Sequence, residues 1–197
     1  MERRRKEGSE ETTERLIKIS EEHQSTINVM SEVACGILLQ NSNGSDDVVF
    51  GKVVSGRNAP IKNIDNIVGL FINTIPVRVT AEEGMTAEEL LEAMQKQSIE
   101  GTEYDFCSLA EIQSMTQQGT ELIKVLYVFE NYGSGKYDEA EEGSEEGEDS
   151  FERESQREQT NYDLSMSGYI KEGRLGFDIM YDPNKYVSEE IEKVLER

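Results

Sequence analysis

The sequence predicts an α/β fold in which helices flank a mixed β-sheet. Two apolar runs, 48–54 and 67–79, are rich in β-branched residues and are separated by a polar link with Gly and Pro. This pattern is typical of two buried strands joined by a loop. A third run, 123–132, is apolar on both faces. A strand without a polar face is expected in the middle of a sheet that is covered on both sides.

Five helices are predicted from apolar side chains at three- and four-residue steps and from capping residues. They are expected at residues 12–22, at 27–40 after a Ser25/Thr26 cap, at 86–100, from 108 and from a Ser188 cap onward. The second helix is expected to bury one face, made of Ile27, Met30, Val33, Ala34, Ile37 and Leu38. Thr86 with Glu89, and Ser108 with Glu111, each fit a capping box, in which hydroxyl and carboxylate satisfy orphan helix donors reciprocally.

The chain is expected to form one domain, residues 12–197, after a charged and disordered segment, 1–11. Residues 133–159 contain almost no apolar side chains, and within them 138–158 carry eleven acidic residues against two arginines. Such a stretch cannot bury enough surface to offset its ordering entropy, so we expect a flexible acidic loop.

A β-hairpin is expected in the last part of the chain. The runs 162–170 and 174–181 flank the short turn Lys171-Glu172-Gly173, which is the spacing of two antiparallel strands.

The formal net charge of −21 excludes whole classes of partner. Nucleic acid and anionic membrane surfaces both need Lys and Arg to neutralise phosphates, so neither is expected as a ligand. No run approaches the roughly 18 apolar residues of a membrane span, and we expect a cytoplasmic protein. Cys35 and Cys107 lack metal-ligand spacing, which favours free thiols over a disulfide or a zinc site.

Catalytic motifs are absent from the sequence. There is no GxSxG, no phosphate loop, no HExxH and no cysteine with a plausible base. The single histidine, His23, lies at the end of a predicted helix, where a cation is ordinary electrostatics. We therefore predict no catalytic residue and no metal ligand, and composition alone indicates a binding or structural domain.

An uncharged polar pair, Asn73-Thr74, interrupts the second apolar run. Burying an amide and a hydroxyl costs on the order of 1–3 kcal/mol unless both are hydrogen-bonded. These side chains therefore either tie one strand to its neighbour or face a cavity. The same two alternatives apply to Ser55 and Arg57, which would ordinarily be turn residues.

Two adjacent motifs carry a resemblance to a known family. VVFGKVVSGR (48–57) followed by IVGLFINTIPVRV (67–79) resembles the C-terminal half of a condensation domain of the nonribosomal peptide synthetases. EYDFCSLAEIQ (103–113), KVLYVFENY (124–132) and TNYDLSM (160–166) follow in the family's order. Epimerisation domains share the fold but have an aromatic residue after the Gly and lack the Asn-Thr pair, so LFINT favours condensation.

The resemblance implies a chloramphenicol-acetyltransferase-like half-domain. In the family, two similar halves meet in a V around a tunnel, and carrier proteins present acyl and aminoacyl phosphopantetheine thioesters from opposite ends. The amine of one attacks the thioester of the other, so an amide forms without ATP, metal or a bound cofactor. The implied partners are an N-terminal condensation subdomain and peptidyl carrier proteins. The family motif HHxxxDG lies in that N-terminal half, so a chain with one histidine is expected to be inactive alone.

Carried over to this chain, the tunnel wall would contain Ser55, Gly56, Arg57, Asn73 and Thr74. Small and amide side chains could hydrogen-bond the pantetheine arm, and the Gly would permit close approach of backbone. Two segments depart from the family pattern, namely TQQGTE before the third strand and the acidic loop. The alternative is a stand-alone, non-catalytic module of the same fold that binds a carrier protein or a basic partner.

Overall fold

Six strands form one mixed sheet in the computed structural model, which describes residues 1–130 and 160–196. The strands are β1 (Glu2–Glu7), β2 (Asp47–Val54), β3 (Asn73–Thr80), β4 (Val125–Glu130), β5 (Leu164–Lys171) and β6 (Arg174–Tyr181). Their order is β1-β6-β5-β4-β2-β3, with β4 parallel to both of its neighbours and the other pairs antiparallel. The predicted acidic loop, 133–159, lies outside the described residues.

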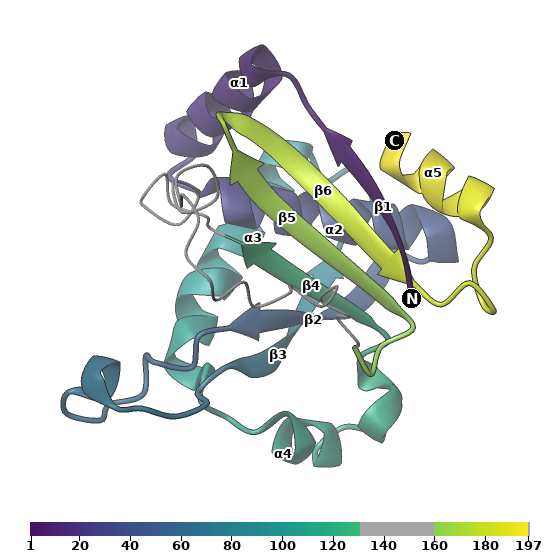
Figure 1. Cartoon of the computed structure of the whole chain (residues 1–197). Coiled ribbons are helices and arrows are strands. Elements are labelled where there is room, and N and C mark those ends of the chain that lie inside the picture. The colour runs from purple at the N-terminus through teal and green to yellow at the C-terminus, as the bar shows by residue number, and fades with distance from the viewer. Residues whose placement is uncertain (131–159, 197) are drawn as a thin grey trace, which may run out of the picture.

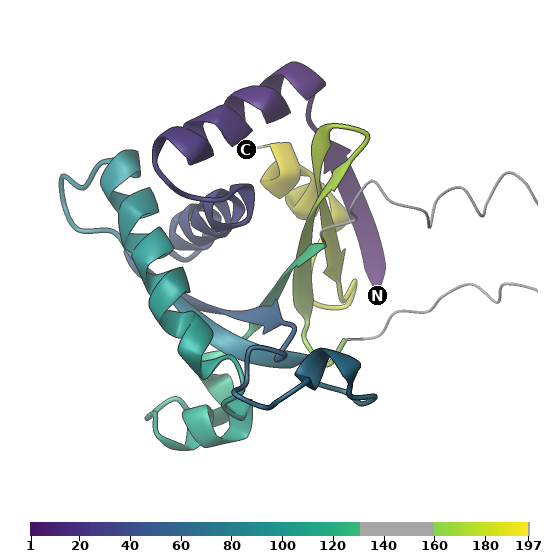
Figure 2. The same cartoon turned by 90° about the vertical axis from the view of Figure 1, so that its left-hand side faces the viewer.

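Helices lie on one face of this sheet (Figures 1 and 2). They are α1 (Glu10–Glu22), α2 (Ile27–Asn43), α3 (Ala87–Gly101), α4 (Leu109–Ser114) and α5 (Ser188–Glu196), with short 3-10 turns η1 (Ile64–Asn66), η2 (Thr102–Tyr104) and η3 (Gly119–Leu122). The α/β class, the hairpin β5–β6 and the central position of β4 are confirmed. The sheet was expected to be covered on both sides, whereas the described helices cover only one.

The core lies between the sheet and helices α2 and α3. Phe50 of β2 and Tyr127 of β4 are fully buried and meet edge to face, with ring centroids 5.8 Å apart. Aromatic pairs in this arrangement add about 0.5–1.5 kcal/mol beyond the area that they bury. Val79 of β3 and Leu91 and Met94 of α3 complete the same cluster.

Helix α2 is rotated relative to the predicted face. Its buried side includes Val29, Glu32 and Gly36, whereas Ala34 and Ile37 from the predicted face are exposed. A helix that is surrounded on most sides has no clean apolar stripe, which is why periodicity misjudged it. Ala34 and Ile37 instead border a largely apolar cavity of about 520 Å³ between α1, α2, β6 and α5.

The prediction that residues 1–11 are disordered is wrong, because this segment contains β1 and the start of α1. β1 pairs with β6 over six residues, from Glu2↔Tyr181 to Glu7↔Gly176. Arg5 donates two hydrogen bonds to the buried carboxylate of Asp178, at 2.7 and 2.9 Å. A strand with no apolar side chain gives no hydrophobic signal in the sequence, and charged side chains are common on edge strands.

At the opposite edge of the sheet, a side chain of α3 contacts β3 at Arg78. The side-chain amide of Gln97 accepts from the Arg78 N–H at 3.2 Å and donates to the Arg78 carbonyl at 2.8 Å. These two bonds occupy backbone groups that β3 would otherwise present at its free edge. The capping box of Thr86 and Glu89 at the start of α3 is confirmed, whereas Ser108 makes no capping hydrogen bond at the start of α4.

A glycine in α2 sets how closely this helix approaches the sheet. A Cβ at Gly36 would lie 2.6–2.8 Å from three side-chain atoms of Val79. We predict that Gly36→Ala lowers the free energy of unfolding by about 1–3 kcal/mol, because the overpacked helix must move. Gly101→Ala is the matched control, since nothing lies within 4 Å of its Cβ position, and it should be neutral or stabilising by up to about 1 kcal/mol. Urea unfolding of both variants tests this, and equal stability would contradict it.

Candidate functional site

The two motifs that the sequence singled out meet at one end of the β2–β3 pair. Val54, the last residue of β2, lies opposite Asn73, the first residue of β3. The long connection between these strands therefore starts, with Ser55, Gly56 and Arg57, next to the point where it ends at Asn73. Four of the five predicted site residues are thus brought together at this junction.

Arg57 and Gly56 hold the connection in place. The Arg57 guanidinium donates to the carbonyls of Ile64 and Ile67, at 2.6 and 3.3 Å, and lies 4.5 Å from the centre of the Phe71 ring. Gly56 has a φ of +65°, and a Cβ there would overlap the Phe71 carbonyl oxygen. Only glycine satisfies both conditions without strain. The charge of Arg57 is therefore used to shape the connection.

Asn73 ties β3 to the segment that follows α3. Its amide nitrogen donates to the carbonyls of Asp105 and Cys107, at 2.8 and 2.6 Å. Asn58 reaches the same segment by donating to the Asp105 carboxylate at 2.8 Å. Of the two alternatives left open by the sequence, this geometry favours the structural one for Asn73.

Ser55 and Thr74 differ from the other three predicted residues. Ser55 is exposed at the rim of a cavity, and its hydroxyl accepts from the Arg57 N–H at 3.4 Å. Thr74 follows Asn73 in the strand, so its half-buried side chain points to the opposite face of the sheet. The structure therefore separates the Asn-Thr pair, with the amide and the hydroxyl serving different faces.

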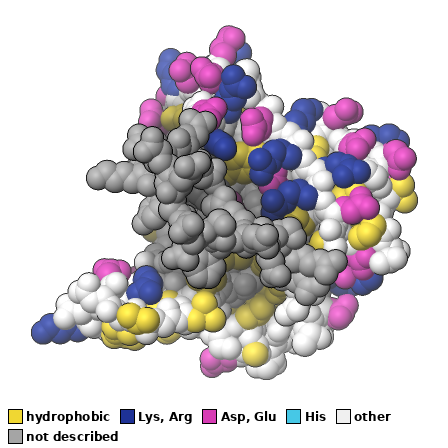
Figure 3. Space-filling view, in the orientation of Figure 1, with side chains coloured by type: hydrophobic (Ala, Val, Ile, Leu, Met, Phe, Trp, Pro, Cys, Tyr) yellow, Lys and Arg dark blue, Asp and Glu magenta, His cyan; other side chains and the backbone are white. Residues whose placement is uncertain are grey.

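The connection between β2 and β3 forms a projecting arm, residues 55–72, at the lower left of Figure 1. A strand was predicted to start at residue 67, but β3 starts at Asn73. The predicted boundary is therefore wrong, and residues 67–72 belong to the arm. Four of their five apolar side chains are exposed, with Val68 fully exposed and Leu70 86% exposed, whereas Phe71 is half-buried against Arg57. Figure 3 shows hydrophobic side chains gathered along this arm. The hydrogen bonds from Arg57 to the carbonyls of Ile64 and Ile67 help to fix this segment, which has no strand partner.

A cavity of about 230 Å³, lined by both apolar and charged side chains, lies beside the junction, between β2, β3 and the last turns of α3. Its wall includes an ion pair of Glu32, which is only 1% exposed, and Lys52, with Lys Nζ 2.7 Å from the carboxylate oxygen. Ser55 and Asp105 line the same cavity. A buried charge of this kind is costly unless it is paired, so Glu32 and Lys52 depend on each other.

Burial also changes the acidity of the groups around this cavity. Loss of hydration raises the pKa of Glu32, and the nearby Lys52 ammonium only partly offsets this effect. Burial raises the pKa of Asp105 as well, against the hydrogen bond from Asn58. Cys35 is a buried thiol whose pKa is raised to about 12, chiefly by burial, and it is therefore unreactive near neutrality.

Sequence reasoning missed Glu32, Lys52 and Asp105. One signal was present for Glu32, which is an acidic residue within an otherwise apolar stretch of a predicted core helix. Charged residues are almost never fully buried without a partner, so its position alone indicates a buried cation nearby. Nothing in the sequence identifies Lys52 as that cation, because the pairing depends on how α2 crosses β2.

The comparisons with known proteins agree with this architecture. A family model described as the condensation domain matches residues 1–197. Bacitracin synthase 1 from Bacillus licheniformis is 37% identical over 180 residues, which cover 90% of this chain and 3% of the synthase. Tyrocidine synthase 3 from Brevibacillus parabrevis is 44% identical over 158 residues, which cover 79% of this chain and 2% of that synthase.

Solved structures show the same fold. A four-domain nonribosomal peptide synthetase bound to AMP and glycine superimposes with a TM-score of 0.80 at 16% identity, over 98% of this chain and 16% of that one. The first condensation domain of the CDA synthetase gives 0.73 at 16% identity, over 100% of this chain and 43% of that one.

These similarities define first a fold, the chloramphenicol-acetyltransferase-like fold of condensation domains. Because the family match extends over residues 1–197, the chain belongs to the condensation-domain family of the nonribosomal peptide synthetases. The chain spans less than half of the solved condensation domain and a few per cent of the curated synthetases. None of the described helices is both long and apolar enough to cross a lipid bilayer.

The ion pair beside the cavity generates a prediction about stability and pH. Lys52→Met leaves the Glu32 carboxylate buried without a cation, which should cost about 3–5 kcal/mol near neutral pH. Because burial raises the folded-state pKa of Glu32, its protonation favours the folded state. The lost stability should therefore return as pH falls through the folded pKa towards the unfolded value.

The double variant Glu32→Gln/Lys52→Met removes both charges and serves as the control. Urea unfolding between pH 5 and pH 8 should show a steeper pH dependence for the single variant than for the double variant. Parallel pH profiles would show that Glu32 is not the group that titrates.

Proposed function

We propose that residues 1–197 are the C-terminal subdomain of a condensation domain and form one wall of its tunnel. In that tunnel, carrier-bound acyl and aminoacyl thioesters would be joined by an amide bond. The observation that carries the proposal is one of coverage, because the chain matches the family over residues 1–197 but spans 43% of a solved condensation domain. In addition, its arm presents apolar side chains to solvent. A second half of the domain would cover such a surface.

The arm is the surface that we assign to the N-terminal condensation subdomain. Val68, Leu70 and Ile72 are all more than 60% exposed, and exposed apolar patches on a soluble protein commonly mark an interface. Tyr104 and Phe106 are exposed beside Asp105, which accepts hydrogen bonds from Asn58 in the arm and from Asn73, the residue that follows the arm. Burying each large apolar side chain is worth about 1.5–3 kcal/mol, so a few of them suffice to hold two halves together.

The chain would contribute to amide formation by positioning the two substrates. Attack of an amine on a thioester needs a group that handles the amine proton, and the junction residues provide no imidazole. The single histidine of the chain excludes HHxxxDG, so the partner half would supply this motif. In this proposal, the hydroxyl of Ser55 at the rim of the cavity would hydrogen-bond an extended substrate, and the hydroxyl of Thr74 would be available on the opposite face of the sheet. Arg57 and Asn73 would act indirectly by shaping the wall.

Peptidyl carrier proteins are the second partner class in this proposal. Their phosphopantetheine arms would bring both substrates, so the subdomain itself would need no bound cofactor. The reaction would take place in the cytoplasm, where the free thiols of Cys35 and Cys107 persist in a reducing environment.

The first prediction concerns activity in isolation. Residues 1–197, supplied with loaded donor and acceptor carrier proteins, should give no amide above the uncatalysed rate, because positioning alone leaves the amine proton unhandled. Adding the matching N-terminal half should restore turnover, measured as product by mass spectrometry. Turnover by the isolated chain would overturn the proposal.

The second prediction concerns the arm. Val68→Ser/Leu70→Ser should weaken association with the N-terminal half by about tenfold or more, because two apolar side chains no longer become buried. Both side chains are exposed in the isolated chain, so its melting temperature should stay unchanged. Ile99→Ser on α3 is the matched control, since Ile99 is also exposed but lies away from the arm. Equal weakening by both variants, measured by calorimetry, would show that the arm is not the interface.

A further inference from the structure

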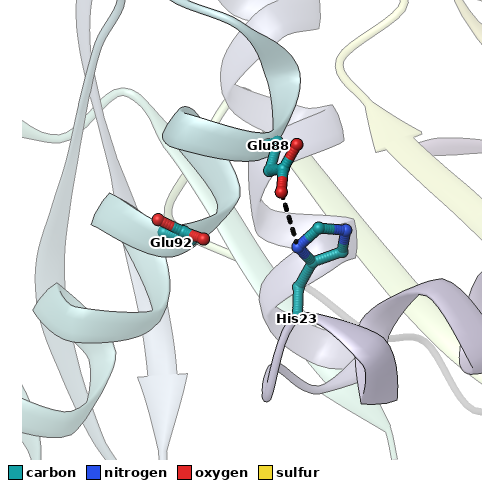
Figure 4. A group of neighbouring side chains, drawn as sticks. All are labelled: His23, Glu88 and Glu92. Carbon is teal, nitrogen blue, oxygen red and sulfur yellow. Dashed lines mark ion pairs between the residues drawn. The ribbon is translucent and has the colours of Figure 1, made fainter.

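Three side chains with metal-ligating atoms gather away from the junction, on the surface where α1 ends beside α3. Figure 4 shows His23 from the end of α1 pointing toward Glu88 and Glu92, which lie one turn apart on α3. The His23 Nδ1 atom is 3.4 Å from a Glu88 carboxylate oxygen. One potential ligand atom from each of the three residues lies within 4.8 Å of the others.

The donor set fits a divalent transition cation. Zinc takes imidazole nitrogen and carboxylate oxygen at about 2.0–2.2 Å, so ligand atoms in a tetrahedral site are about 3.3 Å apart. The distance from His23 to Glu88 already has this value. Glu92 is exposed, so rotation of its side chain can close the remaining gap without moving the backbone. The imidazole distinguishes this group from a purely acidic cluster, which would suit calcium or magnesium.

The local charge favours a cation at this point. Glu88 and Glu92 are spaced four residues apart on one helix, and like charges at this spacing repel. Within residues 1–130 and 160–196, no Lys or Arg side chain forms an ion pair with either carboxylate. His23 also lies at the C-terminal end of α1, where the helix dipole favours positive charge.

The two segments are already fixed relative to each other. Ser25, two residues beyond His23, donates a hydrogen bond to the Gln95 side chain on α3 at 3.0 Å. The backbone N–H of His23 bonds to carbonyls of the last turn of α1. A cation would therefore meet three ligands on ordered segments and lose little free energy to ordering them.

We propose that His23, Glu88 and Glu92 bind a divalent transition cation of the zinc class, with water completing the coordination. The bound ion would fasten the α1–α2 junction to α3 and would be structural, since the site lies apart from Ser55 and Thr74. Because it binds the folded state, it would raise the melting temperature of the chain.

The single histidine of the chain makes the test specific. In a tag-free, 15N-labelled sample of the full chain, zinc chloride should shift the imidazole nitrogen signals of His23 saturably at a 1:1 ratio. Glu92→Gln should weaken this binding by about tenfold or more, because one zinc–carboxylate bond is lost. Glu100→Gln is the matched control on the same helix, where Glu100 pairs with Lys96, and it should bind as the wild type does.

Two outcomes would overturn the proposal. Unchanged His23 signals in zinc at about a hundredfold excess over protein would show that no site forms, since even surface sites saturate there. Equal affinity in Glu92→Gln and Glu100→Gln would show that Glu92 is not a ligand and that the three-residue site does not exist. A melting temperature that zinc raises in the wild type and in Glu100→Gln, but not in His23→Gln, would support the structural role.

Discussion

The connection between β2 and β3 depends on polar side chains that satisfy backbone groups where no strand partner exists. Arg57 bonds two carbonyls within the arm, and Asn73 bonds two carbonyls beyond α3. Backbone carbonyls left without partners would cost more than the arm could recover, since it has no core of its own. These four bonds therefore let an irregular segment keep a fixed shape while Val68, Leu70 and Ile72 remain exposed to solvent.

Positive charge is scarce in this chain, and three of its cations make contacts that hold the fold together. Lys52 neutralises a buried carboxylate, Arg5 neutralises Asp178, and Arg57 bonds the arm. Lys52 and Arg5 each fix one element against another, α2 against β2 and β1 against β6, whereas Arg57 acts within the arm. In the described residues, the buried carboxylates of Glu32 and Asp178 thus each have a cation beside them. Acidic partners would meet long-range repulsion that added salt screens.

Capping residues and apolar periodicity predicted the class of fold and most elements, because β-branched runs and capping boxes can be recognised in the sequence alone. They failed where stability comes from contacts between distant segments. β1 has no apolar residue and is held by its pairing with β6, and residues 67–72 are apolar but are held out of the sheet by Arg57. The polar pair at the junction was identified, but only the geometry shows that Asn73 is structural and that Glu32 and Lys52 lie beside it.

Both edges of the sheet carry features that disfavour pairing with further strands. Charged side chains line β1 at one edge, and Gln97 bonds both backbone groups of Arg78 at the other. Open edges are the common starting point for aggregation and for intermolecular strand exchange. A half of a larger domain that exposes apolar side chains on an arm would be prone to such exchange if its sheet were also open. Because both edges disfavour such exchange, the arm would select a neighbouring domain by shape and apolar contact and not by indiscriminate backbone pairing.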